Sequence, residues 1–173
     1  MTKQVKIRIR ATAIDLVLAE KYQSTAENGC FTDEDGHILP LERLNEACEQ
    51  RIGYTVTGEL SMEGARYTLR YTEPADLGLD NCTTLFAFSS DTPSIFTMIR
   101  TGDVRATFHF DANDSRQLCT YETPIMPVEF TVITRKVRNT VTEKGGAVVL
   151  DYLLEVRGIN TERNRLFIEV EPL

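Results

Sequence analysis

The amino-acid sequence predicts an all-β protein: a single antiparallel up-and-down β-barrel of about 8–10 strands, with a helical insertion after the first strand. Short runs of alternating apolar and polar residues recur along the chain, which is the period of a strand with one buried face. Turn residues separate these runs at short intervals. The 173 residues suffice for one domain with a full core. We therefore expect residues 1–173 to form one barrel domain, closed so that few strand edges are exposed.

Four runs predict strands most clearly, at residues 5–13, 65–72, 104–111 and 148–156. In the first, Val5 and Ile7 lie on one face and Lys6 on the other. Further strands are expected near residues 52–62, 82–90, 94–100, 116–122, 127–139 and 163–171. The pair Gly145-Gly146 predicts a tight hairpin turn, because such turns require positive φ.

Residues 15–51 interrupt this alternation. A helix is predicted by apolar residues that follow Pro40 at spacings of three and four: Leu41, Leu44, Cys48 and Ile52. Residues 16–21 fit either a short helix or a prolonged first strand. We expect this segment to form a helical lid or plug between the first and second barrel strands.

Composition and charge exclude several classes of function. The 19 basic and 26 acidic residues give a net charge of −7, which repels nucleic-acid phosphates and anionic lipid. We therefore expect no nucleic-acid partner and no membrane partner. The start of the chain is charged and lacks the apolar run of a signal peptide, and the four cysteines are scattered. These features predict reduced thiols and a cytoplasmic protein.

No motif in the sequence indicates catalysis, a cofactor or a metal. The glycine-rich runs of nucleotide-binding loops and the nucleophile elbow of hydrolases are both missing. The two histidines, His37 and His109, lack partners at ligand spacing. The run from Asp33 to Gly36 has its glycine at the fourth position rather than the sixth position of a calcium loop, so we interpret it as a polar turn.

Polar residues at the ends of apolar strands mark the candidate site, which consists of Tyr71, Glu73, Arg100 and Tyr121. Glu73 continues the inward-facing positions of its strand, and Arg100 ends another strand just before a turn. Tyr121 precedes Pro124, where a strand must bend or stop. A carboxylate, an arginine and tyrosine hydroxyls could orient a small polar ligand in an apolar cavity. The alternative is a buried Glu–Arg pair that only closes the end of the barrel.

An ordered set of short motifs resembles the YwiB-like family, a bacterial domain of unknown function among the calycin (lipocalin-like) barrels. The set comprises Tyr71-Thr72-Glu73, Thr83-Thr84, Arg100-Thr101-Gly102, His109-Phe110, Tyr121-Glu122-Thr123-Pro124, Gly145-Gly146 and Leu150-Asp151-Tyr152. The resemblance covers the first strand and about residues 53–171. It implies an antiparallel barrel and, by analogy with the superfamily, a ligand cavity. It implies no reaction, so no catalytic residue is carried over.

Three hypotheses follow from the sequence. The first is a non-catalytic barrel that binds a small, partly apolar ligand inside, with Tyr71, Glu73, Arg100 and Tyr121 at its polar end. The second is a structural or interaction module with a filled barrel, which contacts a partner or a second copy through residues 15–51. The third is an enzyme in which Glu73 transfers a proton and Arg100 holds an anion.

Overall fold

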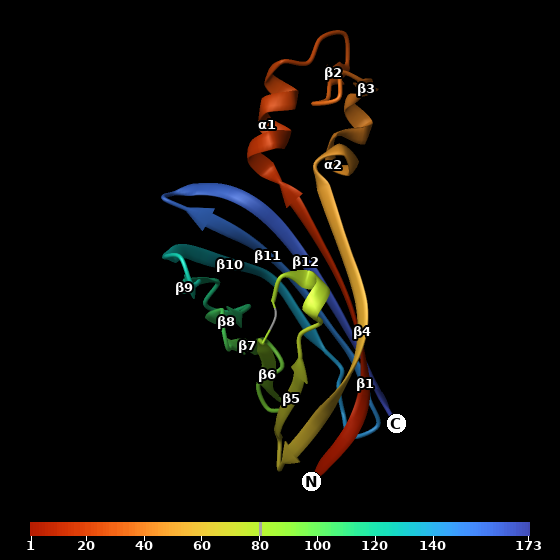
Figure 1. The fold of residues 1–173 in the computed structure, drawn as a ribbon, viewed down its shortest axis with the longest axis vertical. Coiled ribbons are helices and arrows are strands. Elements are labelled where there is room, and N and C mark those ends of the chain that lie inside the picture. Colours follow the sequence, from red (N-terminus) through yellow and green to blue (C-terminus); the bar gives the residue numbers. More distant parts are fainter. Residues whose placement is uncertain (80) are drawn as a thin grey trace.

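Ten antiparallel strands form a closed barrel, as the sequence predicts (Figure 1). The structure is a computed structural model that describes residues 1–79 and 81–173. Strands β4 to β12 follow one another around the barrel, and β1 lies between β12 and β4 and closes it. This up-and-down order leaves every barrel strand with two neighbours.

The strands divide into a long set and a short set. The long strands are β1 (Thr2–Asp15), β4 (Glu49–Glu63), β10 (Pro127–Asn139), β11 (Gly146–Val156) and β12 (Ile159–Pro172). The short strands are β5 (Arg66–Thr72), β6 (Thr83–Ser89), β7 (Ile95–Thr101), β8 (Arg105–Asp111) and β9 (Arg116–Glu122). The long strands extend beyond the short ones on the side of the barrel that carries the extension (Figure 1). One end of the barrel therefore has walls of unequal height.

The alternation in the sequence places the core inside the barrel. Val5 and Ile7 have no exposed surface, whereas Arg8, between Ile7 and Ile9, reaches outward to Glu169 on β12. Ile9 lies opposite a residue of each neighbouring strand. Burying these side chains stabilises the fold by about 25 cal/mol for each Å² of apolar surface removed from water.

Aromatic rings from both short and long strands fill much of the barrel interior. On one side, the ring centroids of Phe86 and Phe96 are 5.3 Å apart, and those of Phe88 and Phe96 are 5.4 Å apart. On the other, Phe110 lies 4.8 Å from Tyr152. These spacings are those of contacting aromatic pairs, so this part of the barrel is packed with side chains.

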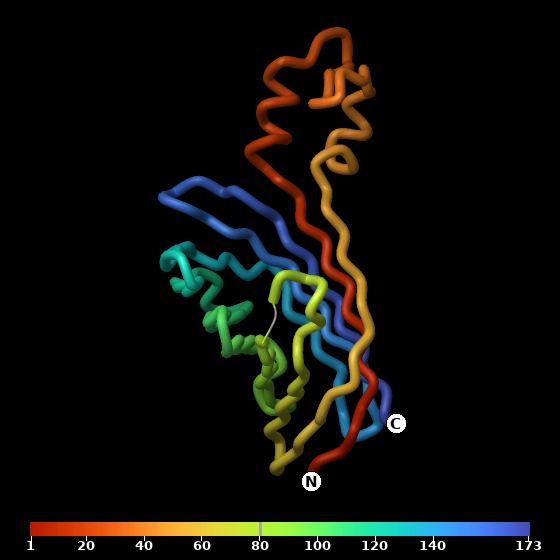
Figure 2. The backbone as a smooth tube through the Cα atoms, viewed as in Figure 1, coloured from red at the N-terminus to blue at the C-terminus, as the bar shows by residue number. Residues whose placement is uncertain are grey.

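Residues 16–48 form an extension that stands away from the barrel, as Figures 1 and 2 show. It contains helix α1 (Leu16–Ser24), strands β2 (Cys30–Thr32) and β3 (Ile38–Pro40), a short 3-10 turn at residues 41–43 and helix α2 (Leu44–Ala47). The Asp15 side chain accepts a hydrogen bond from the Leu18 amide and so begins α1 directly at the end of β1. Tyr22, Phe31 and Cys48 are the buried centre of a separate small core.

The structure confirms helices in the insertion but differs from the prediction in two details. The two-stranded sheet of β2 and β3 lies between the helices. The helix predicted from Leu41 to Ile52 ends at Ala47, because the chain pairs with β1 from Glu49 onward. Ile52 lies in β4 opposite Ala11, so pairing between strands overrides the helical spacing there. Residues 16–21, which fitted two conformations, are helical.

Within the described residues, no helix combines the length and apolar character required to cross a membrane.

Candidate functional site

Glu73 lies at the centre of the candidate site. It directly follows β5, and its amide donates to the Cys82 carbonyl, which holds the chain beside the start of β6. The Glu73 side chain has no exposed surface. The prediction that Glu73 points into the barrel is confirmed.

Four side chains donate hydrogen bonds to the Glu73 carboxylate. Tyr54 donates to Oε2 at 3.1 Å, and Tyr71 donates to Oε1 at 3.2 Å. The Thr84 hydroxyl and Nη2 of Arg100 also donate to Oε1, the latter at 3.1 Å. A carboxylate removed from water needs such partners, and here both oxygens have them.

Strand register explains why these residues meet. Thr84 on β6 lies opposite Tyr71 on β5 and opposite Arg100 on β7. Arg100 therefore reaches Glu73 across one intervening strand, and its Nε donates to the Thr84 hydroxyl at 3.3 Å. Thr84 thus accepts from Arg100 and donates to Glu73. The three strands hold one continuous hydrogen-bonded network.

The network shifts the proton affinities of its members. Burial raises the pKa of Tyr54 to about 12 and also raises the pKa of Tyr71. Burial alone would lower the pKa of the Arg100 guanidinium, but the Glu73 carboxylate together with Tyr121 and Tyr71 outweighs this effect and raises it. Arg100 therefore remains a cation and the tyrosines remain neutral near pH 7.

Tyr121 lies beside the network rather than within it. Its hydroxyl is close enough to Arg100 to contribute to the raised pKa of the guanidinium. Its ring packs near Phe108 and Phe130, with both centroids at 6.4 Å. The structure thus joins Tyr71, Glu73 and Arg100 directly and places Tyr121 at their edge.

The geometry does not favour the acid–base enzyme hypothesis. Both oxygens of Glu73 accept hydrogen bonds, and the side chain has no surface that a substrate could touch. A general acid or base must come within hydrogen-bond reach of the reacting group. Arg100 differs, because its side chain retains 13% exposure and its Nη1 atom is outside the network around Glu73.

A second polar row lies on the wall formed by β10, β11 and β12. Tyr152 on β11 lies opposite Thr134 on β10 and opposite Asn164 on β12. Thr134 Oγ1 and Asn164 Nδ2 are buried without a hydrogen-bond partner among the described residues. Tyr152 and Tyr71 belong to the same buried core, so this row and the Glu73 network both face the barrel interior. Orphaned buried polar groups are rare and need an explanation.

The site predicted from the sequence did not include five polar residues of this region: Tyr54, Thr84, Thr134, Tyr152 and Asn164. The alternation of β4 and β6 could have placed Tyr54 and Thr84 on inward faces. No sequence signal identifies Thr134 and Asn164 as unpartnered, because that property depends on which strands adjoin β11.

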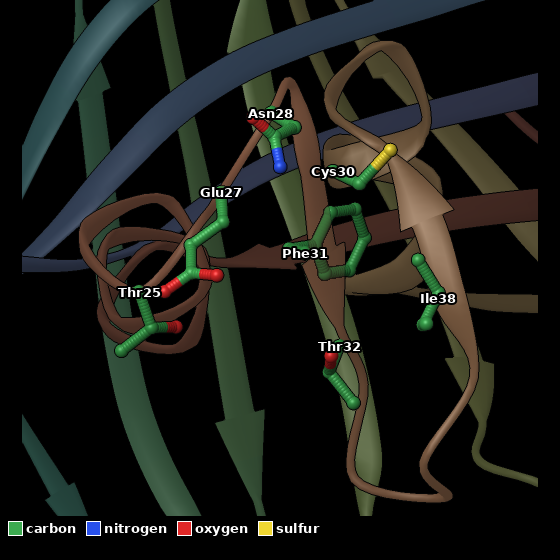
Figure 3. Close-up of a pocket in the computed structure, with 7 residues that line it drawn as sticks. All are labelled: Thr25, Glu27, Asn28, Cys30, Phe31, Thr32 and Ile38. Carbon is green, nitrogen blue, oxygen red and sulfur yellow. The ribbon is translucent and has the colours of Figure 1, made fainter.

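A pocket of about 500 Å³ lies within the extension (Figure 3). The ring of Phe31 occupies its middle, with the Glu27 carboxylate on one side and Ile38 on the other. Phe31 also stacks on Tyr22 at a centroid distance of 5.1 Å. None of the four predicted site residues lines this pocket.

The acidic run after β2 forms a turn. One oxygen of the Asp33 carboxylate accepts from the amides of Asp35 and His37, and the other oxygen lies 3.1 Å from the His37 ring. Asp33, Asp35 and His37 bring potential ligand atoms within 4.8 Å of one another. Their hydrogen bonds are those of the polar turn that the sequence predicts.

Comparison with known families now identifies the chain. Residues 42–168 match the family described as "Domain of unknown function (DUF1934)". The protein belongs to this family. The DUF1934 match covers β4 to β11 and most of β12, and therefore includes all four predicted site residues. The family description names no activity. No curated protein matches the chain.

One solved structure shares the fold. The crystal structure of the ywiB protein from Bacillus subtilis is similar with a TM-score of 0.69 at 14% sequence identity, over 99% of this chain and 93% of that chain. At this identity the similarity establishes the barrel architecture alone. The predicted YwiB-like resemblance is confirmed at the level of family and fold.

Proposed function

We propose that this DUF1934 protein binds a small, partly apolar ligand at the polar end of its barrel. The ligand would lie between the Glu73 network and the Tyr152 row. Its acceptor group, a carboxylate or a carbonyl, would receive hydrogen bonds from Arg100 and Asn164, while its apolar part would pack on aromatic rings. We also propose a cytoplasmic location, because scattered cysteines suit a reducing compartment.

The observation that carries this proposal is the pair of unpartnered polar atoms, Thr134 Oγ1 and Asn164 Nδ2. Leaving a buried donor or acceptor without a partner costs about 1–3 kcal/mol. A ligand that supplied the missing partners would offset that cost. Arg100 supports the same conclusion, since its side chain is 13% exposed and only its Nε and Nη2 atoms donate to Thr84 and Glu73.

Substituting Asn164 separates a binding role from a structural one. In Asn164→Leu the orphaned amide is replaced by an apolar group of similar size, so the unliganded protein should keep or raise its melting temperature. The same change should abolish binding. Thr134→Val is a second variant of this kind, and Thr107→Val on the exposed face of β8 is its matched control.

The binding measurement combines native mass spectrometry with thermal shift. We expect protein isolated from cells to carry an excess mass that Asn164→Leu lacks. We expect octanoate or phenylacetate, but not 1-octanol, to raise the melting temperature of the unmodified protein. A ligand at 100 times its Kd adds about 2.7 kcal/mol to the free energy of unfolding. If the native mass equals that of the polypeptide and neither acid shifts the melting temperature, the proposal is wrong.

A second candidate function is contact with a partner or a second copy through the extension. The observation that favours it is exposure: Ile38 is 76% exposed and Val17 is 52% exposed on a segment that stands away from the barrel (Figure 1). Exposed apolar side chains that project in this way are common at interfaces. Light scattering at low micromolar concentration should show a dimer that Ile38→Ser disrupts. If the protein is a monomer at all concentrations, the partner must be a different protein, which crosslinking would detect.

A further inference from the structure

The outer wall of the barrel carries a groove that lies apart from the proposed ligand site. The groove has a volume of about 660 Å³ and crosses β4, β1, β12 and β11. A neighbouring hollow of about 370 Å³ shares Arg10 and Gly53 with it. Phe167 and Val149 contribute apolar surface to the groove. The groove is therefore part of the barrel exterior and does not depend on an open interior.

Strand register gathers three arginines around one threonine in this groove. Thr12 on β1 lies opposite Arg51 on β4 and opposite Arg165 on β12. Side chains opposite one another on adjacent strands have Cβ atoms about 4.5–5.5 Å apart. Arg10 lies two residues before Thr12 and so projects from the same face of β1. All three arginines line the groove.

These charges are only partly neutralised. Arg51 pairs with Glu49 at 3.1 Å. Arg165 approaches Asp151 at 3.6 Å, but Asp151 is held more closely by Arg163 at 2.9 Å.

Arg10 lies 4.5 Å above the centre of the Phe167 ring and pairs with no carboxylate among the described residues. In a protein of net charge −7, a groove with this excess of arginine is an exception to the overall charge.

We propose that this groove binds a small organic anion that carries a carboxylate or phosphate on a flat aromatic body. Arginine presents paired N–H donors that match either anionic group, and its planar guanidinium stacks on aromatic rings. Arg10 already stacks on Phe167 with one face, which leaves the other face for a ring of the ligand. Arg51 and Arg165 then hold the anionic group above Thr12.

Gly53 makes the groove deep at the position beside Arg10. It lies directly opposite Arg10 in the pairing of β1 and β4. A Cβ atom built at Gly53 would meet its nearest neighbours at 3.8 Å, from the Ile9 carbonyl oxygen, and at 3.9 Å, from the Arg10 side chain. These are ordinary van der Waals contacts. A side chain at this position would therefore fill the groove without disturbing the strands.

This tolerance provides a variant that blocks the groove while keeping all of its charges. Gly53→Val should fold normally and occlude the site. Arg10→Gln removes the unpaired cation and leaves a shorter, neutral polar side chain. Arg66→Gln is the matched control, because Arg66 is an exposed arginine on β5 outside the groove.

Binding is measured by isothermal titration with 2-naphthyl phosphate and 2-naphthoate, and with inorganic phosphate and 2-naphthol as the separate halves of these probes. We expect at least one aromatic anion to bind, and Gly53→Val and Arg10→Gln each to weaken it about tenfold or more, which corresponds to about 1.4 kcal/mol. Arg66→Gln should leave its affinity unchanged. The stronger of the two aromatic anions identifies the preferred acidic group.

Three outcomes would overturn the inference. The first is that neither aromatic anion binds. The second is that inorganic phosphate binds equally well and Gly53→Val has no effect, which would mean an adventitious ion only. The third is that Arg66→Gln weakens binding as much as Arg10→Gln, which would mean attraction to surface charge in general. Asn164→Leu should not affect binding to the groove. The groove proposal can therefore fail independently of the proposed ligand site in the barrel interior.

Discussion

Arg100 reaches across β6 to Glu73, with its Nη2 atom 3.1 Å from the Oε1 atom of the carboxylate. The Glu73 side chain has no exposed surface, and Arg100 retains 13% exposure. Because the acid is fully desolvated, its attraction to Arg100 and the hydrogen bonds from the three hydroxyl groups together offset its lost hydration. The ion pair therefore contributes to the stability of the fold and also lies at the proposed ligand site. Its removal should lower the free energy of unfolding.

Glu73→Gln should destabilise the protein strongly. The substitution leaves the Arg100 charge mostly buried without its counter-charge, which costs about 3–5 kcal/mol when a buried pair is broken. Urea denaturation followed by circular dichroism measures the change in the free energy of unfolding. Glu63→Gln at the exposed end of β4 is the matched control and should change it by less than about 0.5 kcal/mol.

The double variant Glu73→Leu with Arg100→Met tests whether the pair acts as a unit. Each single substitution leaves one buried charge without its partner, whereas the double substitution removes both charges. The loss in the double variant should therefore be smaller than the sum of the two single losses, by about 1 kcal/mol or more. Additive losses would show that the two side chains contribute independently.

Alkaline pH should weaken the fold through Tyr54, whose pKa is raised to about 12 by burial. The unfolded chain releases this proton near pH 10, whereas the folded protein holds it up to about 12. The contribution to stability is thus complete below about pH 10 and is lost as the pH rises toward 12. Tyr54→Phe should reduce the slope of the free energy of unfolding against pH above pH 10, by at most about 1.4 kcal/mol for each pH unit. An unchanged slope would contradict the burial of this hydroxyl.

Substitution by alanine should affect stability differently at two glycines of β4. A Cβ atom at Gly58 would lie 2.5 Å from the Arg70 carbonyl oxygen and 2.5 Å from Ile7 Cδ1, so Gly58→Ala should cost about 1–3 kcal/mol. Gly53 has no neighbour closer than 3.8 Å, so Gly53→Ala should be neutral or slightly stabilising. Thermal denaturation of both variants provides the comparison. Equal losses of stability in the two variants would contradict the close approach of β4 and β5 at Gly58.

Thiol labelling should distinguish Cys30 from the other cysteines. Cys30 is half-buried in the extension, while Cys48, Cys82 and Cys119 are buried. Burial raises the pKa of Cys119 to about 11, which lowers its thiolate fraction further. In the native protein one thiol should react quickly with Ellman's reagent, and Cys30→Ser should remove that phase. Rapid reaction of a second thiol would show that part of the core opens readily.

Local patterns in the sequence were sufficient to predict the barrel wall. The alternation around Val5 and Ile7 identifies a strand and its buried face without knowledge of its neighbours. The helical spacing from Leu41 to Ile52 failed because it is also a local pattern, and pairing of β1 with Glu49 and the residues after it stabilised a strand instead. Where local spacing and long-range pairing favour different secondary structures, the one that forms the larger set of hydrogen bonds is adopted.

The candidate site was predictable only in part for the same reason. The inward position of Glu73 and the place of Arg100 at the end of β7 follow from the sequence alone. That they meet depends on Thr84, which lies opposite Arg100 in the register of β6 and β7.

The sequence by itself determined most of the barrel strands and which of their side chains face inward, because both properties repeat within a few residues. Only the tertiary structure decided which inward side chains meet. Closure of the barrel and the register between its strands bring Arg100 to Glu73, leave Asn164 without a partner and assemble three arginines around Thr12. Such contacts join residues far apart in the chain, and no local pattern specifies them.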